Sequence, residues 1–150
     1  MLEDRYDIKT APDAETFEFD SVGPRGTVRK VVRYSEINLR NFYNLGFGDK
    51  DELTGFISDL TVTNNDDSRK VLATVAATLY AFTDTHPGAT IIATGSTNAR
   101  TRLYRMGIAA NLEEIESDFD VLGLNTGIEW ESFCKNATYG AFLVRRKSYI

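Results

Sequence analysis

The sequence has little cysteine and little histidine: Cys134 and His86 are the only examples among 150 residues. A single cysteine excludes an intramolecular disulfide and a metal site built from several thiolates. A single histidine leaves no cluster of the imidazole and carboxylate ligands that catalytic zinc needs. We therefore expect no metal site, and the scarcity of cysteine favours a cytoplasmic protein.

Long hydrophobic runs are also missing. No apolar stretch approaches the roughly 20 residues that a membrane-spanning helix requires. Residues 1–7 lack the basic start and apolar core of a secretion signal. The formal net charge of −5 disfavours binding to nucleic acid or to anionic membranes through net charge. We expect neither a membrane nor a nucleic-acid partner.

Motifs of several enzyme classes are absent too. Neither a Walker loop nor a Gly-x-Ser-x-Gly nucleophile elbow occurs. What the chain does have is 42% apolar content in 150 residues, which is enough for a sizeable core without disulfides or metal. We expect a single domain over residues 1–150.

The first part of the chain predicts two β-hairpins. Alternating apolar residues over 17–22 and a β-branched run over 28–34 flank a glycine-rich turn, which indicates the first hairpin. The second has its arms at residues 41–48 and 56–63, joined by a polar connection that ends in glycine.

A helix and a buried strand come next. The apolar residues from Val71 to Phe82 recur at helical spacing, after capping candidates at residues 64–68. A proline and a glycine after His86 end this helix. The run from Thr90 to Thr94 then predicts a central strand, and a β-α-β unit implies parallel pairing of its two strands.

The last part predicts two helices and two strands. We expect a helix from Ser96 to Met106 that stops at Gly107, and a short helix over residues 110–116. Strands over 119–124 and 139–146 follow. The predicted fold is α+β, with a mixed, mostly antiparallel sheet, one parallel β-α-β step and helices on its faces.

The stretch from Thr90 to Ile108 is the most informative for function. It predicts a buried strand that passes through a glycine into an arginine-bearing helix, whose first amides lack partners within the helix and can bind an anion. A strand-to-helix junction needs a glycine and a cap in any case, so a purely structural role stays open. The candidate anion-binding residues here are Gly95, Ser96, Thr97, Asn98 and Arg100.

Three short segments in the same stretch are similar to a segment found in a known enzyme family. Asn98, Leu103-Tyr104 and Gly107-Ile108 are similar to a segment of GNAT-type acyl-CoA-dependent N-acyltransferases. The order of elements over residues 28–147 also resembles the core of that family, including its strand order. The resemblance implies a coenzyme A thioester as ligand and Tyr104 as the general acid that protonates the departing thiolate.

The resemblance extends to the loop that holds pyrophosphate in the family. Its equivalent here is the stretch from Arg69 to Thr74, which adds Arg69 to the candidate anion ligands. Leu72 stands where the family has a glycine, and its side chain occupies space that pyrophosphate would need. This departure favours a binding role without catalysis.

A second resemblance covers almost the whole chain. The segments 41–49, 71–76 and 95–104 are similar to those of a small uncharacterised bacterial family, a domain of unknown function. This resemblance implies no activity.

Two functions are consistent with these observations. In the first, the chain is a non-catalytic binding or interaction module on a GNAT-like fold. It would assemble with itself or with a protein partner through a sheet edge, or through a basic patch where Arg29-Lys30 and residues 145–147 adjoin. In the second, it is a divergent acyl-CoA-dependent N-acyltransferase or a small-anion-binding protein.

Overall fold

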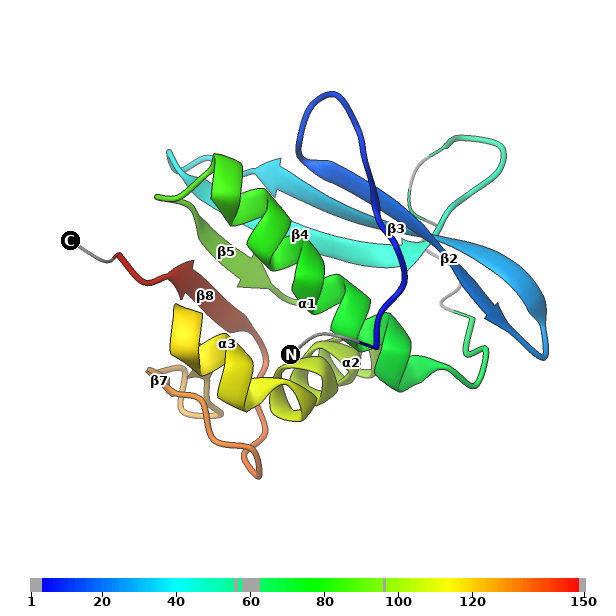
Figure 1. The fold of residues 1–150 in the computed structure, drawn as a ribbon. Helices are drawn as coiled ribbons and strands as arrows, with labels where there is room; N and C mark the ends of the chain where they lie inside the picture. Colours follow the sequence, from blue (N-terminus) through cyan, green and yellow to red (C-terminus); the bar gives the residue numbers. More distant parts are fainter. Residues whose placement is uncertain (1–3, 56, 58–62, 96, 149–150) are drawn as a thin grey trace.

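The computed structural model describes residues 4–55, 57, 63–95 and 97–148. In these residues the chain forms one mixed sheet of eight strands, with helices packed on it (Figure 1). The strands lie in the order β1-β2-β3-β4-β5-β8-β6-β7. The predicted α+β class is therefore confirmed. In chain order the elements are β1 (Lys9–Thr10), β2 (Thr16–Gly23), β3 (Gly26–Glu36), β4 (Phe42–Asp49), α1 (Ser68–Thr85), β5 (Thr90–Ala93), α2 (Asn98–Ala110), α3 (Leu112–Asp118), β6 (Phe119–Leu124), β7 (Trp130–Ser132) and β8 (Phe142–Arg146).

The first predicted hairpin consists of β2 and β3. The two strands are antiparallel, from Thr16 opposite Arg33 to Gly23 opposite Gly26. Gly26 has a φ of 86°, a left-handed conformation that glycine adopts at no steric cost. A glycine at position 26 therefore suits the left-handed backbone conformation of this hairpin turn.

The second predicted hairpin is described only in part. Its first arm is β4, which pairs with β3 in the antiparallel sense. Its second arm was expected over residues 56–63, of which 56 and 58–62 lie outside the described residues. Ile57 forms an isolated bridge with Lys50, and its side chain lies 3.2 Å from the place that a Cβ of Gly46 would take.

The parallel step runs from β4 through α1 to β5. β5 pairs with β4 from Thr90 opposite Phe42 to Ala93 opposite Leu45. β5 ends there, whereas β4 continues to Asp49. The sheet therefore opens beyond Leu45, and α2 begins at this opening.

The helix expected to stop at Gly107 is longer than predicted. α2 continues through Gly107 to Ala110, so the predicted stop is wrong. A Cβ on Gly107 would lie 3.2 Å from Cδ2 of Leu72 on α1. The glycine therefore lets two helices approach closely, a role that a sequence does not distinguish from a helix end.

The last strand, β8, lies between β5 and β6 and is antiparallel to both. Its central residue, Val144, is opposite Ile91 on β5 and Val121 on β6. The strand predicted over 119–124 is confirmed as β6, and the one predicted over 139–146 begins only at Phe142. The edge strands β1 and β7 were not predicted, because runs this short carry no readable alternation.

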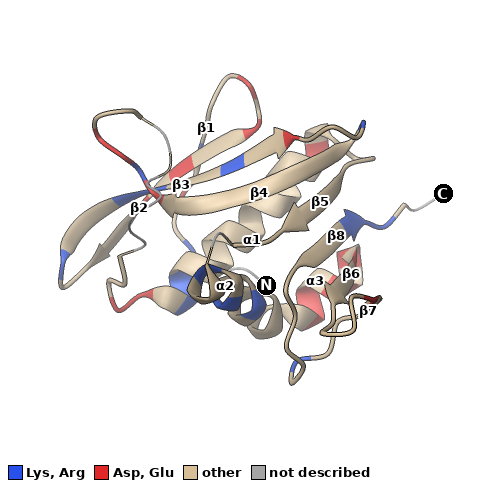
Figure 2. Cartoon of the chain, turned by 180° about the vertical axis from the view of Figure 1, so that it is seen from behind, with Lys and Arg blue, Asp and Glu red and all other residues tan. Residues whose placement is uncertain are grey.

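The core lies between the sheet and the helices. In Figure 1, α1 and α3 lie in front of the strands, and the reverse view in Figure 2 has the strands in front of α1. An aromatic cluster joins the two layers: Tyr34 of β3 stacks on Phe82 of α1 with ring centroids 4.2 Å apart, and Tyr43 of β4 meets the same ring edge-on at 4.9 Å. His86 stacks on Phe82 at 4.3 Å, so the only histidine belongs to this cluster.

Ile128, in the turn between β6 and β7, combines two unfavourable features. Its φ is 61°, a conformation that crowds a β-branched side chain, and the residue is 81% exposed. We expect Ile128→Gly to raise the free energy of unfolding by about 1 kcal/mol, because left-handed strain in a non-glycine residue costs roughly 1–3 kcal/mol and glycine loses more backbone entropy on folding. Urea unfolding measures this change.

The matched control is Thr126→Gly, an exposed position in the same turn without a left-handed φ. It should lower stability, because only the entropic cost of glycine remains there. A loss of stability in both variants would contradict the strain at Ile128.

Candidate functional site

The predicted anion-binding corner lies between β5 and α2. The Gly95 N–H donates to Thr101 Oγ1 at 3.1 Å, and the Arg100 N–H donates to Thr97 Oγ1 at 3.2 Å. A Cβ on Gly95 would lie 2.5 Å from the Cβ of Arg100, so glycine is needed for the chain to pass this close to the helix. Ser96 lies outside the described residues. Two N–H groups of the corner, those of Gly95 and Arg100, therefore already have acceptors within it.

The other two candidate anion ligands lie at opposite ends of α2. Asn98 is exposed in the first turn of the helix. Arg69, on α1, lines a polar groove of about 450 Å³ together with Asn111 and Glu114, beyond the last turn of α2. α2 has 13 residues, and at about 1.5 Å per residue its ends lie about 18 Å apart. The structure therefore does not bring Arg69 to the corner.

Tyr104, the candidate general acid, lies inside the opening between β4 and β5. It is 9% exposed, and its hydroxyl donates to the carbonyl of Leu45 at 3.4 Å. Burial raises the pKa of the Tyr104 phenol to about 12. The remaining cavity has a volume of about 40 Å³ and is walled by apolar side chains, among them Leu72, Ile91 and Ile108.

A larger cavity, of about 170 Å³, lies next to the first turn of α1. It was not predicted. A cavity of about 150 Å³ in another protein admits benzene, so this one has room for a small organic molecule. Its walls differ in character: one is apolar, with Phe47, Val71, Leu72, Leu103 and Met106, and the other is polar, with Lys30, Thr63, Asn64, Asp67 and Ser68.

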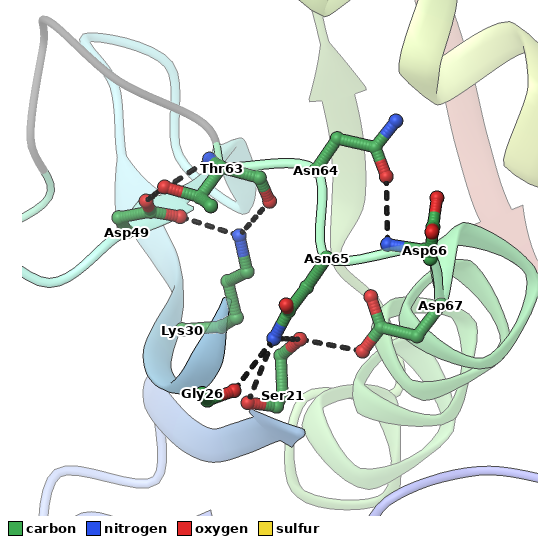
Figure 3. A network of polar contacts seen from close by, with 9 residues as sticks. All are labelled: Ser21, Gly26, Lys30, Asp49, Thr63, Asn64, Asn65, Asp66 and Asp67. Atoms are coloured by element: carbon green, nitrogen blue, oxygen red, sulfur yellow. Dashed lines mark hydrogen bonds and ion pairs between the residues drawn. The ribbon is translucent and has the colours of Figure 1, made fainter. Parts of the chain in front are cut away.

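The polar wall is anchored by a buried ion pair (Figure 3). Lys30 is 1% exposed, and its Nζ lies 2.5 Å from Asp49 Oδ1 and 2.8 Å from the carbonyl oxygen of Thr63. The other carboxylate oxygen of Asp49 accepts the Thr63 N–H at 3.0 Å and the Thr63 hydroxyl at 2.5 Å. A buried lysine needs such partners, because an unpaired charge in the interior costs several kcal/mol.

Two further side chains extend this network toward α1. The Asn65 amide donates to the Gly26 carbonyl at 2.8 Å, and its oxygen accepts the Arg25 N–H at 2.7 Å. Asp67 Oδ2 accepts the hydroxyls of Ser21 at 2.5 Å and of Tyr6 at 2.6 Å. Asp67 precedes α1, but its side chain makes no capping hydrogen bond to the helix.

The predicted basic patch does not form. β3 and β8 are separated by β4 and β5, Arg29 pairs with carboxylates of the neighbouring strand β2, and Arg146 pairs with Asp84 of α1. Lys30, a residue of the predicted patch, is buried. One signal could have placed it: Lys30, Val32 and Tyr34 alternate along β3, and a period of two puts all three on the buried face.

The described residues contain no group of three or more His, Cys, Asp or Glu side chains placed to hold a metal ion. Within the same part of the chain, no helix combines the length and the apolar character needed to cross a membrane. Comparison with known proteins matches residues 2–147 to the model of a family whose function is unknown. No curated protein matches the chain, and neither does any solved structure.

The ion pair leads to a prediction for stability. Lys30→Met should lower the free energy of unfolding by about 3–5 kcal/mol, because it leaves the Asp49 carboxylate buried without its cation. The double variant Lys30→Met with Asp49→Leu should recover much of this loss, since an apolar pair of similar size avoids the cost of desolvating two charges. Urea unfolding of the two single variants and the double variant measures the coupling. Additive losses would contradict the pairing.

Proposed function

We propose that this chain, which belongs to the family of unknown function DUF6934, is a non-catalytic binding or interaction module. We also propose that its fold is related to that of GNAT-type N-acyltransferases; the parallel step that opens beyond Leu45 and the closing antiparallel strands support this relationship. The scarcity of cysteine supports a cytoplasmic setting. In this proposal the protein keeps the architecture of that fold without its chemistry.

The observation that carries the proposal is the position of Tyr104. Its hydroxyl already donates to a backbone carbonyl in an apolar interior. Its pKa of about 12 also opposes the role of general acid. Transfer of the proton from Tyr104 to a thiolate of ordinary pKa, about 8.5, would cost about 5 kcal/mol. These features support Tyr104 as a core residue.

The surroundings of Tyr104 support the same conclusion. Leu72, at the position where the N-acyltransferases have a glycine, packs against Gly107 and fills the space between α1 and α2. Arg69 lines a groove with Asn111 and Glu114, at the end of α2 away from the corner. At the corner, the Gly95 and Arg100 N–H groups already donate to the hydroxyls of Thr101 and Thr97. Among the residues that the structure describes, these features oppose the binding of coenzyme A at this opening.

A thermal-shift experiment tests this proposal. We expect coenzyme A and acetyl-CoA, each up to millimolar concentration, to leave the melting temperature unchanged. A ligand at 100 times its Kd would add about 2.7 kcal/mol, a shift of several degrees for a chain of this size. Tyr104→Phe should cost about 1 kcal/mol, the value of one hydrogen bond, and should change nothing else. Stabilisation by acetyl-CoA that Tyr104→Phe alters would contradict the proposal.

A second candidate function is the binding of a small carboxylate in the cavity of about 170 Å³. The observation that favours it is the two-sided wall, because the buried cationic residue Lys30 lines a space whose other side is apolar. A carboxylate with a short apolar body would meet both walls. Asp67, on the same wall, would oppose such an anion.

Titration with butyrate and benzoate, followed by NMR chemical shifts, tests the second candidate. Met106→Trp should abolish any saturable shift, because Met106 is 41% exposed and lines the cavity, so that a larger side chain fills it without disturbing the ion pair. Leu53→Trp, at a position that is 97% exposed elsewhere, is the matched control and should leave binding intact. Binding that both variants retain would place the carboxylate at another site.

A further inference from the structure

The face of the sheet opposite α1 carries an apolar row across its second half. Ile92 of β5 is the register partner of Leu143 of β8, which is the partner of Leu122 of β6. The residues beside them in each strand, such as Ile91 and Val144, are buried against the helices. Because side chains alternate along a strand, the row points away from the helices. All three of its residues are partly exposed.

Such a row is unusual on an open face. An antiparallel sheet with one covered face normally places polar side chains on the other. Within the part of the chain that the structure describes, no helix lies on this face (Figure 2). Trp130 of β7 is 43% exposed and pairs with Leu124, which extends the apolar surface to the edge of the sheet.

Opposite charges lie directly beside this row. Arg145 of β8 and Asp120 of β6 are register partners, and both are exposed. Each lies two positions along its strand from the row, so it shares the same face. The surface therefore consists of an apolar row flanked by one positive and one negative side chain on adjacent strands.

We propose that a second copy of this chain packs face to face on this surface, about a twofold axis that runs along the strands between β8 and β6. This inference rests on the proposed interaction module and names its partner. The axis exchanges β8 with β6 and β5 with β7. It places Leu143 against the partner's Leu122 and Arg145 against the partner's Asp120. Each contact occurs twice, as in any isologous interface.

The charges favour a second copy over another protein. A twofold axis at this place sets Arg145 of each copy against Asp120 of the other. It also sets the apolar row of one copy against the same row of the other. Sheets that pack in this way lie about 10 Å apart, with their strands within about 30° of each other. The same symmetry brings Trp130 of β7 over the end of the partner's β5 and removes it from water.

The oligomeric state of the full chain tests this inference. We expect light scattering coupled to gel filtration to give a dimer that dissociates on dilution. Trp130 is the only tryptophan, so its emission should shift to the blue as the dimer forms. A monomer at every concentration up to several hundred micromolar would overturn the inference. The proposed function would survive that result, since it fails only if acetyl-CoA binds at Tyr104.

Charge reversal tests the register. Asp120→Arg sets arginine against the partner's Arg145, and Arg145→Asp sets aspartate against aspartate, so each should weaken the dimer about tenfold or more. Mixing the two variants should restore dimers, because every contact in the mixed pair joins opposite charges. Glu52→Arg, an exposed reversal elsewhere on the chain, is the control and should dimerise as the wild type does.

Each outcome of the reversal experiment decides the question. A dimer that Asp120→Arg leaves intact would overturn the proposed face. If one single variant fails to fold, which circular dichroism would show, the chain with both reversals keeps the test, because it pairs aspartate with arginine again. That chain should dimerise, and a monomer would contradict the register.

Discussion

Lys30 is a cation that the interior tolerates only because Asp49 lies beside it, and the placement of α1 depends on this pair. The second oxygen of Asp49 accepts hydrogen bonds from the N–H and the hydroxyl of Thr63. From Thr63 the chain passes Asn65, which is bonded to the β2–β3 turn, and enters α1. The charge of Lys30 is thus neutralised by Asp49 at the end of β4, close to the segment that leads into α1. The start of α1, and with it the larger cavity, follows from one buried interaction.

The opening between β4 and β5 is filled by core side chains. β4 outlasts its parallel neighbour by the residues from Gly46 to Asp49, which leaves a wedge that a ligand could enter. Here Tyr104, Leu72 and Ile108 occupy it. The opening in the backbone is thus occupied by side chains that belong to the core. Architecture and chemistry are separable properties of such a sheet.

Strong periodicity is what made the fold predictable. The helical spacing from Val71 to Phe82 and the β-branched run over 28–34 were each long enough to identify their element. Lys30 was expected on a basic surface because of its charge, although the alternation of residues along its strand indicates a buried position. Its burial is possible because Asp49, distant in sequence, lies beside it. The corner at Gly95 was located correctly, but its internal hydrogen bonds depend on helix geometry that a one-dimensional pattern does not contain. A glycine such as Gly107 can mark either a helix end or a close approach of two helices. The contact with Leu72 of α1 shows that the second applies here.

The position of β8 has a consequence for how the protein is made. Among the described residues β8 is the last strand in sequence order, yet it lies between β5 and β6 and joins the two parts of the sheet. A ribosome delivers β1 to β5 and α1 early, and these can pair as they emerge. The strands β6 and β7 must wait beside an exposed edge until residues 142–146 have been synthesised. The nascent chain therefore spends this interval with the β8-facing edges of β5 and β6 unpaired, and exposed edges of this kind favour aggregation.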